Sequence, residues 1–191
     1  FHPVNDDPVI TDDGLADQAV DDNATITLFD TGAGFLISDD DVGDPSGVTV
    51  TITDGNTNGD FTPGSAGGWD REVSGNDIIY SQTFTGAGAD TAAQNAVQAL
   101  EFSPAQNREA PGATEETAFT VAVGDGTAEV NSDAEISVVA TSVNDTPTVD
   151  VNNGLTIVFE DSTGNVINNT LLSSSDVDPG DDANVLVYTI Q

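Results

Sequence analysis

Oxygen-bearing side chains gather in short runs along this sequence. The densest runs are Asp39–Asp41 and Asp176-Val177-Asp178, and each lies between two segments of alternating apolar residues. Two like charges about 4 Å apart repel by roughly 4 kcal/mol at an effective dielectric constant near 20. The carboxylates of such runs must therefore stay solvated, take up protons or bind a cation. Their hard oxygens suit Ca²⁺, which takes six to eight oxygen ligands.

The spacing within these runs excludes a calcium loop built from one continuous segment. An EF-hand loop needs a bidentate Glu at its twelfth position. Counted from Asp39 and from Asp176, that position holds Val50 and Val187. The Gly-Gly-x-Gly-x-Asp pattern of calcium-binding β-helix repeats is also missing. Ligands must then converge from different loops.

A short motif occurs twice and indicates where those loops meet. Val4-Asn5-Asp6-Asp7-Pro8 and Val143-Asn144-Asp145-Thr146-Pro147 lie 139 residues apart, and acidic runs follow both copies. Proline fixes its own φ and favours extended geometry in the residue before it, so each copy predicts a short, stiff connector. We expect a first domain over residues 1–143, a linker over 144–147, and a partial second repeat of about three strands over 148–191.

Two ligand sets follow from this organisation. We expect the first at the boundary between the repeats and the second near the start of the chain. An acidic, solvated surface remains the alternative for both. The first set is Asp21 or Asp22, Glu109, Asn144, Asp145, Asp176 and Asp178, and the second is Asn5, Asp6, Asp39 and Asp41.

Composition limits the classes of partner. The chain has 191 residues, with 34 Asp and Glu against two Arg and no Lys, for a net charge of −32. Nucleic acids and anionic membranes repel such a chain. The absence of cysteine excludes disulfides, zinc–thiolate sites and a Cys nucleophile. No apolar run reaches membrane-spanning length and no signal peptide is visible, so we expect an internal piece of a longer protein.

The hydrophobic pattern predicts an all-β fold rather than disorder. Val48–Ile52, Phe119–Val123 and Ile136–Ala140 alternate or cluster as strands do. Thr91 begins a capping-box pattern, which predicts one short helix from there. Many short strands, turn signals and one helix predict a Greek-key β-sandwich. Residues 54–75 read as a long functional loop.

Beyond the linker, the pattern predicts further strands. Leu155, Ile157 and Phe159 alternate, and 185–190 reads as another strand. So few strands would leave an open edge and an exposed apolar face.

The order of motifs resembles a cadherin-type repeat. Asp21-Asp22, Asp39–Asp41, Asn107-Arg108-Glu109 and Ser142–Asp145 resemble the successive acidic motifs of that family, although Asn107 and Ser142 stand where the family has Asp. From Thr91 to Pro147 the chain also resembles the tandem repeats of large bacterial RTX-type surface adhesins. The resemblance implies an extracellular β-sandwich of the cadherin or immunoglobulin type, rigidified by calcium, on the bacterial surface. Such a module serves cell adhesion and biofilm attachment, with neighbouring repeats of the same chain as partners.

Catalysis and ligand binding are the two other classes of function. Catalysis is disfavoured because the carboxylates lie in turns without Lys, and because the one histidine, His2, lies at the chain end. A peptide- or glycan-binding module near an adhesin tip would use the scarce residue types, since Arg can clamp a carboxylate bidentately. The alternative is that these aromatics belong to the core, that Arg71 pairs with Asp70 or Glu72, and that Arg108 balances neighbouring carboxylates. The candidate ligand-binding residues are Trp69, Arg71, Tyr80 and Arg108.

Overall fold

The structure, a computed structural model, has β-strands as its main regular elements and one helix among the described residues. It describes residues 6–12, 17–29, 34–40, 48–54, 58–125, 132–154, 161, 163, 166–181 and 186–189, and for 48–54 and 132–133 the backbone alone. The elements are β1 (Val9–Asp12), β2 (Gln18–Asp21), β3 (Ile26–Thr27), β4 (Phe35–Ser38), β5 (Val48–Asp54), β6 (Gly59–Phe61), β7 (Asp70–Ser74), β8 (Asp77–Phe84), α1 (Ala89–Gln98), β9 (Glu101–Pro104), β10 (Thr114–Gly124), β11 (Ser132–Thr141), β12 (Thr148–Asn152) and β13 (Leu172–Ser175).

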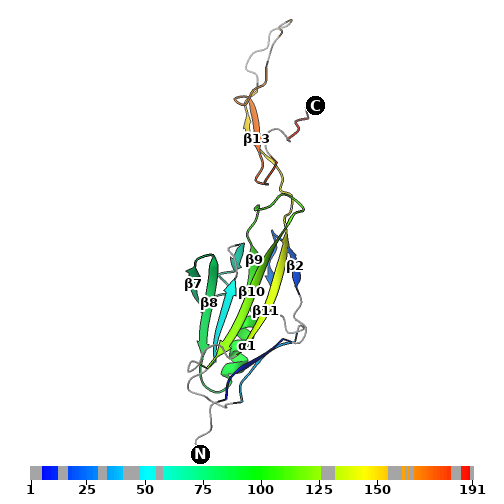
Figure 1. Ribbon diagram of the computed structural model, residues 1–191. Coiled ribbons are helices and arrows are strands. Elements are labelled where there is room, and N and C mark those ends of the chain that lie inside the picture. The colour runs from blue at the N-terminus through cyan, green and yellow to red at the C-terminus, as the bar shows by residue number, and fades with distance from the viewer. Residues whose placement is uncertain are drawn as a thin grey trace, which may run out of the picture.

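The larger layer is a six-stranded sheet in the order β2-β11-β10-β5-β8-β7 (Figure 1). Its pairs are antiparallel except β2 with β11. Residues of β10 are buried at every second position from Thr117 to Val123, as a strand with one face on a core requires. The three strands expected around 48–52, 119–123 and 136–140 are confirmed as parts of β5, β10 and β11.

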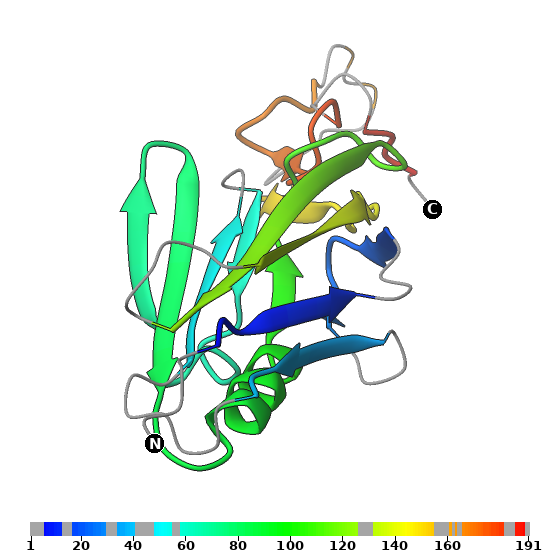
Figure 2. The ribbon, with the colours of Figure 1, turned by 60° about the horizontal axis from the view of Figure 1, so that its bottom comes forward.

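The opposing layer consists of the β3-β9-β6 sheet, the β1–β4 pair and α1, which packs on β4 (Figure 2). Between the layers, Phe61, Phe102 and Phe119 contact one another, with the last two rings edge-to-face at 4.9 Å. Leu28, Phe29, Val97 and Leu100 complete a fully buried cluster. The expected all-β sandwich with one short helix is confirmed.

The helix begins earlier than the capping-box pattern predicted. α1 starts at Ala89, and its N-cap is Gly88, which has a φ of 81° and makes no side-chain cap bond. Glycine adopts the left-handed conformation easily because it has no Cβ. The chain therefore enters the helix at Gly88 without a Ser or Thr cap. Thr91 instead lies exposed in the first turn.

The sequence predicted one long loop over residues 54–75, and this prediction is wrong. These residues contain β6, which pairs with β9, and β7, which pairs with β8 at the edge of the large sheet. All five residues of β7 are exposed. An edge strand that covers no core has no apolar alternation to reveal it, which is why the segment reads as a loop.

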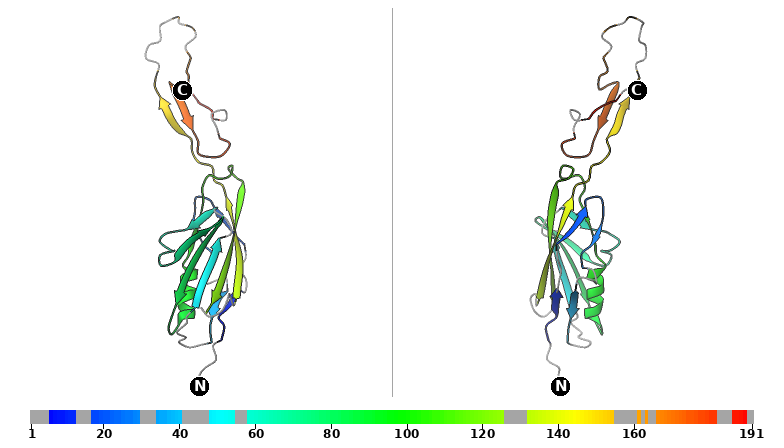
Figure 3. Two further views of the ribbon diagram at one scale, coloured as in Figure 1. Left: turned by 60° about the vertical axis from the view of Figure 1, so that its left-hand side comes forward. Right: turned by 90° about the vertical axis from the view of Figure 1, so that its right-hand side faces the viewer.

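The β12–β13 hairpin projects beyond the end of the sandwich opposite α1 (Figure 3). It exposes apolar side chains, including Val149 at 61%. The expected strand over 185–190 is wrong in its described part, because residues 186–189 form no strand. The Tyr188 hydroxyl lies 2.7 Å from Ser174 Oγ, but a strand needs backbone hydrogen bonds to a partner strand rather than one side-chain bond. The alternating residues 155–159 lie outside the described part of the chain.

Candidate metal centre

Asp22 faces the junction between the sandwich and the hairpin. It follows β2 directly, is only 5% exposed, and its backbone N–H donates to the Thr141 carbonyl at 2.9 Å. Its two carboxylate oxygens accept from the backbone N–H groups of Val143 at 3.1 Å and Asn107 at 3.3 Å. Of the two expected alternatives, the structure therefore places Asp22 at the junction, while Asp21 is exposed.

On the hairpin side, the turn after β13 places Asp178. Asp178, Pro179, Gly180 and Asp181 form a tight turn in which the Asp181 N–H donates to the Asp178 carbonyl at 3.2 Å. Pro fits the second position and Gly180, with φ 96°, fits the third, as in a type II turn. The Asp176 side chain accepts from the Asp178 N–H at 3.0 Å, which fixes the start of this turn.

The turn brings three carboxylates together. One oxygen from each of Asp176, Asp178 and Asp181 lies within 4.8 Å of the others. At that separation each pair of charges repels by about 3–4 kcal/mol at an effective dielectric constant near 20. Asp178 is 4% exposed, so water screens its charge poorly. This group could hold a metal ion.

The linker connects the two sides. The Asp145 N–H donates to Oδ2 of Asp178 at 2.6 Å. The side-chain amide of Asn107 reaches Oδ2 of Asp145 at 2.8 Å and Oδ1 of Asp178 at 3.3 Å, donating to both when its nitrogen faces them. When instead the Asn107 amide oxygen faces Asp145 and Asp178, it and the two carboxylate oxygens have no hydrogen-bond donor between them. A bound cation would then offset their mutual repulsion.

Sequence reasoning missed Asn107 and Asp181. Asn107 has φ 57°, a left-handed conformation that Asn tolerates better than most residues, and this aims its amide at the junction. Its position within the acidic motif of the resemblance was the available signal. The Asp-Pro-Gly-Asp spacing, which predicts a type II turn, could have revealed Asp181.

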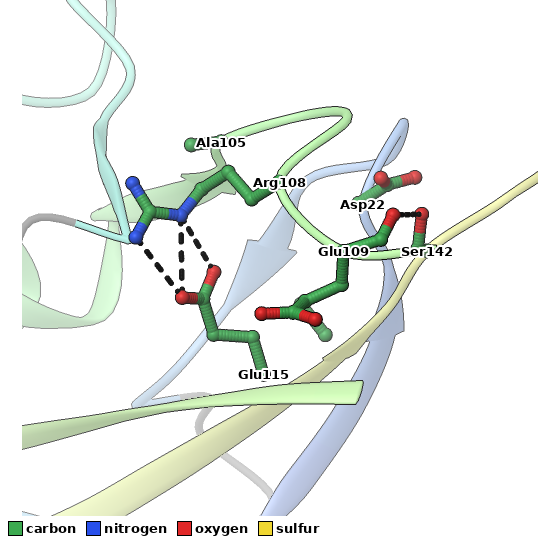
Figure 4. A pocket seen from close by; sticks show the side chains of 7 residues that line it. Asp22, Ala105, Arg108, Glu109, Glu115 and Ser142 are labelled. Atoms are coloured by element: carbon green, nitrogen blue, oxygen red, sulfur yellow. Dashed lines mark hydrogen bonds and ion pairs between the residues drawn. The ribbon is translucent and has the colours of Figure 1, made fainter. Parts of the chain in front are cut away.

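Two expected ligands, Asn144 and Glu109, lie outside the carboxylate group of the turn after β13. Asn144 is exposed, and its side-chain amide nitrogen donates to the Asp145 carbonyl at 2.6 Å. Figure 4 shows the carboxylate of Glu109 turned toward Glu115 and away from Asp22, while the Glu109 carbonyl accepts from Ser142 Oγ at 2.9 Å. The cavity there is about 10 Å³, room for one water.

The second expected set is only partly described. Asn5 and Asp41 lie outside the described residues. Asp6 is exposed, and Asp39 is half-buried directly after β4. The second set therefore stays a prediction.

The four candidate ligand-binding residues do not form one site. Arg71 pairs with Asp60 at 2.9 Å, not with Asp70 or Glu72, because it lies opposite Tyr80 in the β7–β8 register and its side chain points toward β6. Tyr80 is buried, and its hydroxyl donates to Asp60 and accepts from Arg71 Nε.

The other two candidates make different contacts. Trp69 packs edge-to-face on Phe84 at 6.4 Å. Arg108 forms a forked ion pair with Glu115 at 2.9–3.2 Å near the junction, as Figure 4 shows. Both guanidinium groups are thus held by carboxylates of the chain itself.

Comparison of the sequence with models of known protein families finds no match, and comparison with curated proteins finds no similar sequence. Within the described ranges, no helix is long and apolar enough to cross a membrane.

Proposed function

We propose that this chain is a calcium-stabilised extracellular module of a bacterial surface adhesin. In this role Ca²⁺ fastens the sandwich to the segment that follows it, so that the joint transmits force without bending. Side chains from four separate parts of the chain meet at this joint, and three carboxylates of the turn after β13 lie within 4.8 Å of one another, which supports the proposal. Asp22 and Asn107 come from the sandwich, Asp145 from the linker, and Asp176, Asp178 and Asp181 from the turn after β13.

The donor set favours calcium over other ions. It consists of carboxylate and amide oxygens, without the imidazole or thiolate that zinc and copper prefer. Magnesium demands a near-ideal octahedron and retains several waters, whereas calcium accepts the irregular arrangements that converging loops offer. The net charge of −32 adds a long-range attraction for any divalent cation.

The geometry favours a stiffening role over peptide or glycan recognition by the scarce residues. Arg71 and Arg108 would have to leave Asp60 and Glu115 to clamp a ligand carboxylate. A calcium ion at the turn after β13 needs no such rearrangement, because the carboxylates of Asp176, Asp178 and Asp181 already lie within 4.8 Å of one another.

Thermal unfolding of the whole chain in calcium, in magnesium and in chelator tests the calcium proposal. At one hundred times the dissociation constant, a bound ion adds about 2.7 kcal/mol. If the chain unfolds as one unit, that amounts to roughly 5–10 °C in Tm for a chain of this size. Asp178→Asn should remove most of the calcium-dependent rise. Asp70→Asn, on the exposed edge strand β7, should retain it. A Tm that calcium and chelator leave unchanged would exclude a structural calcium ion.

The stiffening role has its own test. Small-angle scattering in calcium should give a sharply defined maximum dimension, which broadens in chelator as the hairpin moves about residues 143–147. Equal profiles in the two conditions would contradict a calcium-stiffened joint even if calcium binds.

A further inference from the structure

The side chain of Asp22 joins two segments that are far from it in sequence. One carboxylate oxygen accepts from the backbone N–H of Val143 at 3.1 Å, and the other accepts from that of Asn107 at 3.3 Å. Val143 lies at the start of the linker, and Asn107 lies in the loop between β9 and β10. Because Asp22 is only 5% exposed, water competes weakly for these two bonds.

The parallel pairing of β2 with β11 brings Asp22 to this place. Asp21, the last residue of β2, lies opposite Thr141, the last residue of β11. The Asp22 N–H then donates to the Thr141 carbonyl at 2.9 Å, which continues the pairing one residue past the end of β2. Asp21 is exposed and Asp22 is buried, as the alternation of side chains along an extended chain requires.

Both residues that Asp22 holds lead to the candidate metal centre. The side-chain amide of Asn107 reaches Oδ2 of Asp145 at 2.8 Å and Oδ1 of Asp178 at 3.3 Å. Asp145 follows Val143 by two residues, and its N–H donates to Oδ2 of Asp178 at 2.6 Å. Asp22 therefore fixes the points from which the loop and the linker approach the carboxylates of the turn after β13.

The contacts of Asp22 disfavour a role as a metal ligand. Among the described residues, the group of three carboxylates close enough to share a metal ion consists of Asp176, Asp178 and Asp181, without Asp22. Each Asp22 oxygen already accepts a charge-assisted bond from a backbone N–H, whose positive end repels a cation that approaches from the same side. The ion would therefore lie on the hairpin side of the junction, out of contact with Asp22.

We propose that Asp22 is a positioning residue that raises the calcium affinity of the junction without touching the ion. It holds the loop and the linker in place before the ion arrives, so less conformational freedom is lost when the ion binds. The effect on affinity rests on the proposed calcium centre, whereas the hold on the two segments does not need the metal. Asp22→Asn keeps the size of the side chain but leaves one backbone N–H facing an NH₂ group.

Hydrogen exchange of the whole chain in chelator tests the hold of Asp22 on the two segments. In Asp22→Asn, the amides of Asn107 and Val143 should exchange about tenfold faster, the scale of one lost hydrogen bond to a charged group, while β10 and β11 stay protected. Asp21→Asn is the matched control, because it makes the same charge change on an exposed neighbour, and it should leave both amides unchanged. Unchanged exchange in Asp22→Asn would overturn the proposal. Should Asp22→Asn unfold the sandwich, Asp22→Glu keeps the charge but displaces it by one methylene, and it should change exchange in the same direction.

Isothermal titration with calcium chloride tests the effect on affinity. Asp22→Asn should raise the dissociation constant about tenfold with the same number of ions bound. Asp21→Asn should change it little, because salt screens a distant, exposed charge. Weaker binding without faster exchange in chelator would make Asp22 a ligand, and faster exchange with unchanged affinity would make it purely structural. Either result overturns the proposal.

The same pair of measurements separates this inference from the calcium proposal. If the unsubstituted chain binds no calcium, the calcium proposal fails, and the effect of Asp22 on affinity fails with it. Faster exchange in Asp22→Asn would then still confirm that Asp22 holds the loop and the linker.

Asn107→Gly should give the reverse pattern. Glycine accepts the φ of 57° at this position and keeps the N–H that bonds to Asp22, but it lacks the amide that reaches Asp145 and Asp178. We expect weaker calcium binding, while the Val143 amide keeps its exchange rate in chelator. Faster exchange of Val143 in this variant would show that the Asn107 amide, rather than Asp22, holds the linker, and it would overturn the proposal.

Discussion

The β1–β4 and β12–β13 hairpins have similar strand pairing but differ in the contacts that stabilise them. Val9 of β1 lies opposite Ser38 of β4, and Thr148 of β12 lies opposite Ser175 of β13. In both, a Val-Asn-Asp motif precedes the first strand and a Ser-Asp step ends the second. The second hairpin is therefore a repeat of the first.

Their burial differs completely. In the β1–β4 pair, Ile10, Phe35 and Ile37 are buried against the core, and α1 packs on β4. In the β12–β13 pair, no residue is buried, and Val149 is largely exposed. A two-stranded hairpin alone is marginal in water. One copy is thus stabilised by hydrophobic packing, while the other depends on the polar contacts of the junction.

Phe35→Ala should reveal the largest difference between the two hairpins. It opens a cavity in the core and should cost about 3–5 kcal/mol of unfolding free energy, measured by urea denaturation. Leu172 holds the same place in β13 and is only half-buried. Leu172→Ala should cost less than about 1.5 kcal/mol, because less apolar area is lost. Equal costs would show that the second hairpin has a core of its own.

With calcium bound, Asp178→Ala should loosen the second hairpin and leave the sandwich unchanged. It removes the acceptor of the Asp145 N–H, a hydrogen bond to a charged group worth about 1.5–3 kcal/mol. Hydrogen exchange of the β12 and β13 amides should therefore accelerate roughly 10–100-fold, while β10 and β11 stay protected. Asp150→Ala is the matched control, because Asp150 is exposed and accepts only from Ser175 Oγ. Acceleration of both sheets together would mean that the hairpin and sandwich unfold as one unit.

The sequence predicted the sandwich well because its central strands have a buried face. β10 repeats apolar residues at period two, and that pattern needs no knowledge of its neighbours. β7 was missed because an edge strand has no buried face, and the helix start was displaced because glycine, not threonine, makes its N-terminal turn.

The candidate site was predictable in part: spacing and the repeated Val-Asn-Asp motif indicated Asp22, Asp145, Asp176 and Asp178, whereas Asn107 and Asp181 were missed. Asp176 and Asp178 were predicted because their Asp-x-Asp spacing is visible in the sequence. Asn107 is brought to Asp178 by the long-range packing of the loop after β9 against the junction, and no local pattern records that approach. Glu109 was predicted from sequence order, but order does not reveal that its side chain turns to the other side of the loop.

Removing the hydroxyl of one tyrosine in the sandwich and of one beside the β12–β13 hairpin should change the unfolding free energy by smaller amounts. Tyr80 is buried and donates to the Asp60 carboxylate, so Tyr80→Phe should cost about 1–2 kcal/mol. Tyr188 is exposed, and its hydroxyl contacts only Ser174 Oγ. Tyr188→Phe should cost under about 0.5 kcal/mol, because water replaces the lost partner. Urea denaturation measures both, and a larger loss at Tyr188 would contradict the marginal packing of the second hairpin.

The Arg108–Glu115 pair should give the smallest effect, although it lies beside the junction. Its arginine is 42% exposed and its glutamate 21%, and exposed ion pairs typically contribute about 0.2–1 kcal/mol, with a forked pair expected near the upper value. A double-mutant cycle of Arg108→Ala and Glu115→Ala should give a coupling within that range. The β12–β13 amides should keep their protection in each variant, because Asn107 is held by Asp22 through its backbone and not through this pair. Loss of hairpin protection in Arg108→Ala alone would show instead that the ion pair positions the loop, and the two hairpins would then be coupled through the sandwich surface.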